Sequence, residues 1–357
     1  MGVKMKTNRK TIILFWILIL TLLLSFTACK KTNEENVDKE NLTEDKIQIG
    51  LCFDSYVIER WQRDRDVFVS TAEGLGAEVN VQNANGDVER QKAQIEYLIE
   101  KGMDVIGIIP IQADAISKEV QKAKDAGIKI IAYDRLITNA NVDLYISFDN
   151  EKVGIIMAEA LVEAGLPNKK VLMICGSPSD NNVSLIEKGF NSVMEKNKID
   201  ILDIAYADGW KAELAATYIY DNIDIVKKVD GIMFGNDDMA TQGIRALSEK
   251  RLIDKIKAVG QDADLVACQR IVEGTQLMTV YKPVDKLAKE AAECAIKLAK
   301  GEPIENAGTI NDGTYTIPYI ALEPIAVNKY NIGKVIVDSG FHLKEDVYLN
   351  ISDYIQN

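Results

Sequence analysis

The segment IQIGLCFDSYVIERWQRDRD, residues 47–66, combines an apolar run with a dense group of charges. The run at 47–53 is typical of a buried strand, whereas six of the eight residues at 59–66 are charged and surround Trp61. Arg60 and Arg63 fall in the first turn of the helix expected here, where positive charge opposes the helix dipole. Two interpretations stay open: a solvated face with i,i+4 pairs such as Arg60–Asp64, or a ligand that needs these side chains.

The pattern that begins in this segment repeats. Gly76, Gly102 and Gly127, which are 26 and 25 residues apart, each precede an apolar strand-like run. Glycine commonly closes a helix in the left-handed conformation, so these residues indicate helix ends. A strand-helix unit of this length predicts a parallel sheet with helices on both faces. The expected strands of this half are residues 47–53, 78–84, 105–111, 129–134 and 144–149.

A second half of similar size follows the first. Its expected helices are 151–165, 183–197, 211–222, 239–250 and 265–273, and an amphipathic helix at 284–300 comes after them. The expected strands of this half are 170–177, 201–207, 231–236, 255–262 and 278–283. The chain is therefore predicted to form two doubly wound α/β lobes, with a ligand at the carboxyl ends of their strands.

Polar side chains recur at those strand ends, together with two tryptophans, Trp61 and Trp210. The carboxylates accept hydrogen bonds, Arg and Lys donate them, and Asn does both. A sugar ring needs such a set around its hydroxyls, and its C–H faces stack on indole rings. A single Asp or Asn after a strand is more often a helix cap, so only the recurrence points to a site. The residues at the strand ends are Glu59-Arg60-Trp61, Asp134-Arg135, Asp180-Asn181-Asn182, Trp210, Asn236-Asp237-Asp238, Gln261-Asp262 and Lys282.

Composition sets further bounds. The net charge of −12 argues against nucleic acid as a partner. Basic residues precede the apolar run at 12–26, and Thr27-Ala28-Cys29 follows it, as in a lipoprotein signal whose cysteine is lipidated; an uncleaved membrane anchor is the alternative. Residues 30–46 are too polar to bury a core and are predicted to be a tether. Cys52, Cys175 and Cys294 lie in apolar patterns and are expected to pack in the core.

The stretches at the strand ends resemble the periplasmic sugar-binding proteins of the ribose/galactose type, and within them the branch that binds D-xylose for ABC importers. The resemblance runs from about Lys46 to His342 and is carried by IERWQRDRD, VQNANGD, AYDRLI, YISFDNEKVG, GSPSDNN, DGW, GQDADL, MTVYKP and SGFH. It implies the type I periplasmic binding fold, with a hinge of three segments near 148–150, 281–283 and 317–324. The resemblance implies that ten residues match the family's ligand-binding positions in type: Arg60, Trp61, Asp134, Arg135, Asp180, Asn182, Trp210, Asn236, Asp262 and Lys282. Arg63 is an eleventh candidate that stands where the family has lysine.

The resemblance also implies the domain boundaries. They are a signal peptide or anchor at 1–29, a tether at 30–46, an N-terminal lobe of 47–148 with 283–318, and a C-terminal lobe of 149–282 with 319–357. The implied function is a membrane-tethered, extracytoplasmic D-xylose receptor that closes on its sugar and presents it to an ABC permease. No cofactor and no metal are expected.

The same sequence features are compatible with two other functions. The receptor could instead be the sensing subunit of a membrane histidine kinase, because it would use the same pocket. Catalysis on sugars would need paired carboxylates, which Asp134, Asp180 and Asp262 could supply. Arg135 beside Asp134 should keep that acid ionised, so no enzyme activity is expected. A repressor is excluded because a hydrophobic export signal stands where a DNA-reading motif would be.

Overall fold

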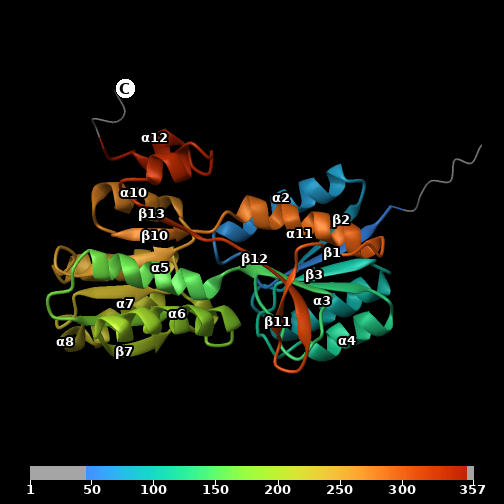
Figure 1. Cartoon of the computed structure of the whole chain (residues 1–357), viewed down its shortest axis with the longest axis horizontal. Coiled ribbons are helices and arrows are strands. Elements are labelled where there is room, and N and C mark those ends of the chain that lie inside the picture. Colours follow the sequence, from blue (N-terminus) through green and yellow to red (C-terminus); the bar gives the residue numbers. More distant parts are fainter. Residues whose placement is uncertain (1–45, 352–357) are drawn as a thin grey trace, which may run out of the picture. The chain divides into compact units, whose positions relative to one another are not determined.

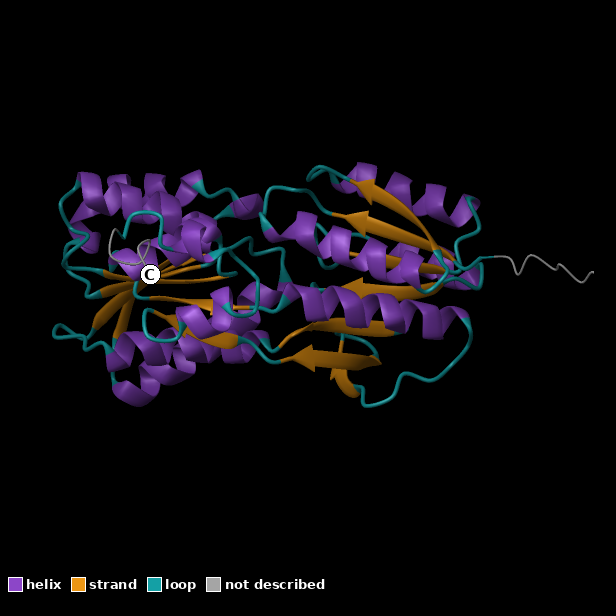
Figure 2. Ribbon diagram, turned by 90° about the horizontal axis from the view of Figure 1, so that it is seen from above, coloured by secondary structure: helices purple, strands orange, loops and turns teal. Residues whose placement is uncertain are grey.

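The structure, a computed structural model, describes residues 46–351 and contains two sheets (Figures 1 and 2). The first sheet has the order β11-β12-β5-β4-β3-β1-β2 and is parallel except for its edge strand β11. Its strands are β1 (Gln48–Phe53), β2 (Glu78–Asn83), β3 (Val105–Ile108), β4 (Lys129–Tyr133), β5 (Leu144–Phe148), β11 (Gly308–Asn311) and β12 (Thr316–Leu322). This sheet and its helices are called the first lobe.

Helices cover both faces of the first sheet, as the alternation of buried side chains requires. Leu51 of β1 packs in a core cluster with Phe68 and Leu287, whereas its neighbour Cys52 packs on the other face with Ile95 and Val120. Successive side chains of a strand point to opposite faces, so one strand serves both cores. The covering helices are α2 (Arg60–Gly74) and α11 (Val284–Ala299) on one face, and α3 (Val88–Glu100) and α4 (Ser117–Asp125) on the other.

The second sheet, with its helices, forms the second lobe. Its order is β13-β10-β9-β8-β6-β7, and only the edge strand β13 is antiparallel. Its strands are β6 (Lys170–Cys175), β7 (Asp200–Tyr206), β8 (Gly231–Phe234), β9 (Lys257–Gln261), β10 (Met278–Tyr281) and β13 (Ile325–Asn328). Its helices are α5 (Asn150–Glu163), α6 (Asn181–Asn197), α7 (Glu213–Asp221), α8 (Ile223–Val226), α9 (Asp237–Glu249), α10 (Leu265–Glu273) and α12 (Lys344–Val347). The prediction of two doubly wound α/β lobes is confirmed.

The glycines that mark helix ends in the sequence have that role in the structure. Gly76, Gly102 and Gly127 follow the ends of α2, α3 and α4 with φ of 91°, 69° and 84°. These angles lie in the left-handed region, which costs a residue with a side chain more than it costs glycine. The turns therefore bring each next strand back at the same end of the sheet.

The chain passes between the lobes three times. The first two passages follow β5 and β10, near the predicted positions, and lead into α5 and α11. The third passage lies at the end of the predicted hinge segment 317–324, but the predicted lobe boundary after residue 318 comes too early. Tyr319–Leu322 of β12 pair in parallel with Tyr145–Phe148 of β5, so the first sheet extends to Leu322 and the second lobe resumes at β13. Pairing between distant strands decides this boundary, and a local pattern does not show it.

The segment after β13 packs on the second lobe, as far as residue 351. Ile332, Ile336, Phe341 and Val347 form a core cluster with Cys268 of α10 and its neighbours. The helix predicted at 211–222 is also different: a short turn at Asp208–Trp210 comes first, and α7 begins only at Glu213. Lys211, the first residue of the predicted helix, has an extended backbone with φ of −71° and ψ of 106°, so the helix starts after it.

The predictions for the N-terminal segment lie outside the described residues. They are the signal peptide or anchor at 1–29, the lipidation of Cys29 and the tether before Lys46. Among residues 46–351, no helix combines the length and the apolar character needed to cross a bilayer. Cys52, Cys175, Cys268 and Cys294 are all buried with free thiols, and burial raises the pKa of each.

Candidate functional site

One cavity lies where strand ends of the two lobes meet. It brings together nine of the eleven predicted residues, although no bound ligand tests their role: Arg60, Trp61, Asp134, Arg135, Asp180, Asn182, Trp210, Asp262 and Lys282. All nine side chains are buried. Asp134 and Arg135 follow β4, Asp262 follows β9 and Lys282 follows β10, whereas Arg60 and Trp61 begin α2. The lobes also touch directly here, since the amide of Ala113 donates to the carbonyl of Ser179 at 3.1 Å.

Two predicted residues do not line the cavity. The Arg63 guanidinium holds the Asp285 carboxylate through two hydrogen bonds of 2.7 and 2.8 Å and donates to the carbonyl of Phe341 at 3.0 Å. The side chain of Asn236 accepts a hydrogen bond from the amide of Met239 at 2.9 Å and caps α9. The structure therefore gives Arg63 a role in joining α2 to α11 and the C-terminal segment, and gives Asn236 the ordinary role of a helix cap.

Four further residues line the cavity: Ile58, Asn150, Ile186 and Gln261. Gln261 ends β9 and Asn150 begins α5 at the first passage between lobes, so both carry the signal of a polar residue at a strand end. Ile58 and Ile186 carry no such signal, because an isoleucine in an amphipathic pattern indicates only core.

Arg60 joins two acids of the first lobe. Its guanidinium contacts Asp64 at 2.9 and 3.1 Å and Asp134 at 2.8 Å. The helical pair Arg60–Asp64, anticipated from the sequence as a solvated pair, therefore exists but is buried. Burial alone would raise the pKa of Asp134, but the cations Arg60, Lys282 and Arg135 outweigh it and hold the pKa below its usual value. Asp134 is therefore ionised at neutral pH.

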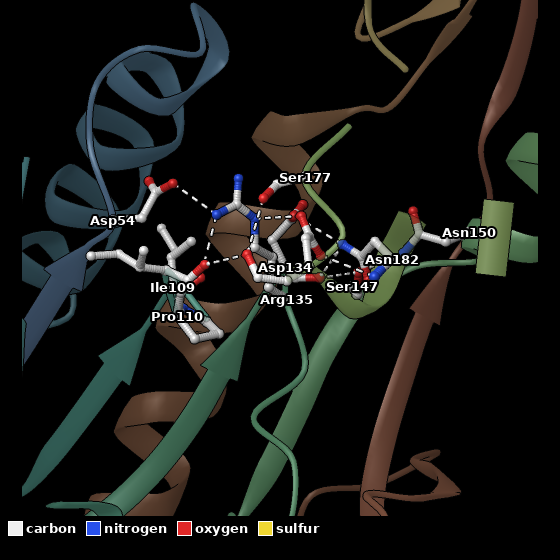
Figure 3. Close-up of polar contacts among 12 residues, drawn as sticks. Asp54, Ile109, Pro110, Asp134, Arg135, Ser147, Asn150, Ser177 and Asn182 are labelled. Atoms are coloured by element: carbon white, nitrogen blue, oxygen red, sulfur yellow. Dashed lines mark hydrogen bonds and ion pairs between the residues drawn. The ribbon is translucent and has the colours of Figure 1, made fainter. Parts of the chain in front are cut away.

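Arg135 connects the lobes (Figure 3). It contacts Asp54 of the first lobe at 2.7 Å and Asp180, which caps α6 of the second lobe, also at 2.7 Å. In the same region Asn182 donates to the carbonyl of Asp134 at 3.0 Å. These contacts run from strand ends of one lobe to a helix start of the other, so they depend on the lobes being close together.

Charges in the cavity lining balance one to one. Arg60 pairs with Asp134, Arg135 with Asp180, and Lys282 with Asp262 at 2.7 Å. An ionic ligand would leave one charge of such a set uncompensated, and an unpaired buried charge is costly. A neutral ligand with many hydroxyl groups matches the lining better, because each hydroxyl both donates and accepts.

Both indoles face this cavity. The Nε1 atoms of Trp61 and Trp210 are buried and have no hydrogen-bond partner among the described residues. A buried N–H normally has an acceptor, so both are donors available to a ligand. The ring of Trp210 lies against Gly176, where an added Cβ would come within 2.3 Å of the ring. The indole of Trp210 therefore packs directly against the backbone of Gly176.

Three lining residues have a left-handed backbone. The φ angles are 62° for Asp134, 59° for Trp210 and 97° for Asp262. Such conformations are unfavourable for residues with side chains, and they concentrate at functional sites. The carbonyl of Asp134 accepts from three donors: Tyr145 at 3.3 Å, and Ser147 at 2.5 Å and Asn182, which Figure 3 shows. The cavity wall therefore contains three residues whose backbone conformation is locally unfavourable.

The carboxyl groups are poorly placed for catalysis. A glycosidase acid must be protonated near neutral pH, whereas the pKa of Asp134 is held low. Burial raises the pKa of Asp180, but Arg135 opposes this and binds its carboxylate. Among residues 46–351 no cluster of His, Cys, Asp and Glu is arranged to hold a metal ion.

Behind the cavity wall lies a buried acid, Asp237, the first residue of α9. Burial raises its pKa, the hydrogen bonds from Thr279 and Gln276 oppose this, and the nearby Asp262 raises it again, to about 7. The pKa of Asp237 is therefore higher in the folded state than the unfolded value of 3.8. Its contribution to stability is fully present below pH 3.8, where the group is protonated in both states, and it is lost as the pH rises through the folded-state pKa of about 7.

We expect Asp237→Asn to reveal this loss, because the amide cannot ionise. The free energy of unfolding of the variant, minus that of the wild type, should increase between pH 5 and pH 8, by up to about 3 kcal/mol. Urea unfolding at both pH values measures it. A difference that does not change with pH would show that Asp237 does not titrate in this range.

The sequence of this chain is similar to those of known sugar-binding proteins. Residues 49–303 match a family model described as periplasmic binding protein domain. The chain is 45% identical over 307 residues to the D-xylose-binding periplasmic protein of Haemophilus influenzae, covering 85% of this chain and 92% of that protein. It is 43% identical to the D-xylose-binding periplasmic protein of Escherichia coli, with 85% and 93% covered. At 31% identity it matches the multiple sugar-binding periplasmic receptor ChvE of Rhizobium radiobacter, over 84% of this chain and 91% of that protein.

Solved structures share the arrangement of the two lobes. The carbohydrate transporter solute-binding protein of Chloroflexus aurantiacus, in complex with D-glucose, has a TM-score of 0.78 and 26% identity, over 84% of this chain and 98% of that one. An ABC transporter solute-binding protein of Clostridium phytofermentans with bound β-D-glucose has a TM-score of 0.75 and 25% identity, with 84% and 99% covered.

Proposed function

Because the chain belongs to the family of periplasmic binding protein domains, which are solute-binding proteins and not enzymes, we propose that its cavity binds a monosaccharide, D-xylose. The observation that carries the proposal is the lining itself: two indoles with free N–H donors around a charge-balanced set of acids, amides and cations. Identities of 43% and 45% with D-xylose-binding proteins support the choice of sugar.

In this proposal the two lobes close on the sugar. Trp61 comes from the first lobe and Trp210 from the second, so one pyranose ring between them contacts both. The closed state gains contacts that an open state lacks, and this difference shifts the population toward closure. An analogue that lacks a matched hydroxyl leaves a buried charged group unpaired and is rejected.

The sugar should bind tightly enough to be seen in a thermal-shift panel. A ligand at about 100 times its Kd adds roughly 2.7 kcal/mol to the native state. For a protein of this size we expect Tm to rise by about 4 °C. D-Xylose should give the largest shift among D-xylose, D-ribose, L-arabinose and D-glucose. Equal shifts for D-xylose and D-ribose would refute the assignment to D-xylose.

We further propose that the protein acts outside the cytoplasm, tethered to the membrane through its N-terminal segment, and delivers its sugar to an ABC importer. The solute-binding relatives of ABC transporters support the delivery. The apolar run at 12–26 followed by Cys29 supports the tether, by lipidation or as an uncleaved anchor. Mass spectrometry of the membrane-extracted protein separates a lipidated Cys29 from an intact N-terminus.

A second function is the sensing subunit of a membrane histidine kinase. One relative bears the name of a multiple sugar-binding periplasmic receptor, which favours keeping this candidate. Both functions use the same cavity and differ in the partner that reads the closed state. A stable xylose-dependent complex with a permease, or instead with the ectodomain of a sensor kinase, decides between them.

A further inference from the structure

The loop after β9 carries Asp262 to the cavity in an unusual conformation. Asp262 and Ala263 have consecutive positive φ angles, 97° and 57°. Ala263 follows a residue of the cavity lining and is itself buried. Two adjacent residues with side chains in the left-handed region cost of order 1–3 kcal/mol each, so the surrounding structure has to hold them.

A chain of hydrogen bonds from Asp237 provides that support. The amide of Ala263 donates to the hydroxyl of Thr279 at 3.2 Å, and this hydroxyl donates to Oδ2 of Asp237 at 2.6 Å. The amide of Asp264 donates to the same carboxylate at 3.2 Å. Asp237 and Thr279 are therefore bonded to both amides that follow Asp262.

The other oxygen of Asp237 is also fixed. Its Oδ1 atom accepts from Nε2 of Gln276 at 2.8 Å. A Cβ at Gly260 would lie 2.3 Å from that Oδ1, so only glycine leaves room for the carboxylate behind β9. Neither Asp237 nor Thr279 lines the cavity, and neither is accessible to solvent. Burying a carboxylate away from water is unfavourable. The hydrogen bonds that Asp237 makes fix the backbone of the loop after Asp262, which indicates what this buried group does.

We propose that Asp237 and Thr279 are positioning residues that hold the 262–264 backbone, and through it aim the Asp262 carboxylate, paired with Lys282, at the ligand. The inference rests on the proposed function for the identity of that ligand. The support of the loop itself does not depend on any ligand.

Thr279→Val tests the proposal because it keeps the shape of the side chain and removes the hydroxyl. We expect the Kd for D-xylose, measured by calorimetry, to rise by about tenfold or more. Thr279→Ser keeps the hydroxyl and should restore the Kd to within about threefold of wild type. Thr217→Val is the matched control, because its hydroxyl bonds only within α7, to the carbonyl of Glu213; its Kd should not change.

Hydrogen exchange in the sugar-free protein gives a second measurement. The amides of Ala263 and Asp264 should exchange faster in Thr279→Val than in wild type, and at the wild-type rate in Thr279→Ser. If wild type binds no sugar but this pattern holds, the proposed function fails and the positioning role stands. If wild type binds D-xylose and Thr279→Val matches it in both Kd and exchange, the positioning role is overturned.

Discussion

Replacing Trp210 by alanine is expected to raise the Kd for D-xylose by roughly 30- to 700-fold. The indole closes the cavity from the second lobe, rests on Gly176 and offers an unpaired Nε1 donor. Truncating a buried aromatic residue at a binding site commonly costs 2–4 kcal/mol, and each 1.4 kcal/mol is about tenfold in Kd. Titration calorimetry with D-xylose measures the change directly.

A variant series separates stacking from hydrogen bonding. Trp210→Phe keeps an aromatic face but removes the N–H donor, so its Kd should lie between those of the wild type and Trp210→Ala. Tyr330→Ala is the control for loss of an aromatic ring, because Tyr330 is 86% exposed on the second lobe and lies away from the cavity. A Kd for Trp210→Ala within threefold of the wild type would mean that this indole does not contact the sugar.

The sequence predicts most of this cavity because parallel strands deliver their carboxyl ends to one edge. Asp134, Asp262 and Lys282 could be named from position alone, since each follows an apolar strand that the pattern identifies. Asn236 obeys the same rule but caps α9, and the pattern cannot distinguish a cap from a ligand contact. The other differences between prediction and structure, at Arg63 and at the end of β12, arise from contacts between segments that are far apart in the sequence.

Arg63 illustrates this limit. It lies three residues after Arg60, but an α-helix turns about 100° per residue, so the two side chains leave α2 in directions about 60° apart. Arg60 points to Asp134, whereas Arg63 meets Asp285 of α11 and Phe341 of the C-terminal segment. The sequence does not show that α11 packs beside α2. The extension of β12 to Leu322 has the same origin, because it depends on pairing with β5.

Arg60 itself allows a second strong prediction. Arg60→Met keeps the length of the aliphatic side chain but leaves Asp64 and Asp134 buried without their cation. Removing one partner of a buried ion pair typically costs 3–5 kcal/mol, so we expect the free energy of unfolding at pH 7.5 to fall by about that amount. D-Xylose binding should also be lost, because Arg60 lines the cavity. Urea unfolding and calorimetry provide the two measurements.

The pH dependence distinguishes this cause from lost packing. In wild type the pKa of Asp134 is lowered, so its contribution to stability is present above the unfolded pKa and is lost as the pH falls through the folded pKa. Without Arg60 the Asp134 carboxylate loses the cation that opposes burial most strongly, so its pKa should rise, and protonation then relieves the unpaired charge. The deficit of Arg60→Met should therefore shrink between pH 7.5 and pH 4.5, whereas a packing defect would stay constant.

The matched control lies one turn further along the same helix. Arg65 pairs with Asp66 at the surface, with 32% and 67% of their side chains exposed. Pairs of this kind contribute little, at most about 1 kcal/mol, so Arg65→Met should leave both the stability and the Kd nearly unchanged. If the two variants lost equal stability, the charge of Arg60 would have no special role. The buried pairs of Arg60 with Asp64 and Asp134 would then contribute no more to stability than a surface pair does.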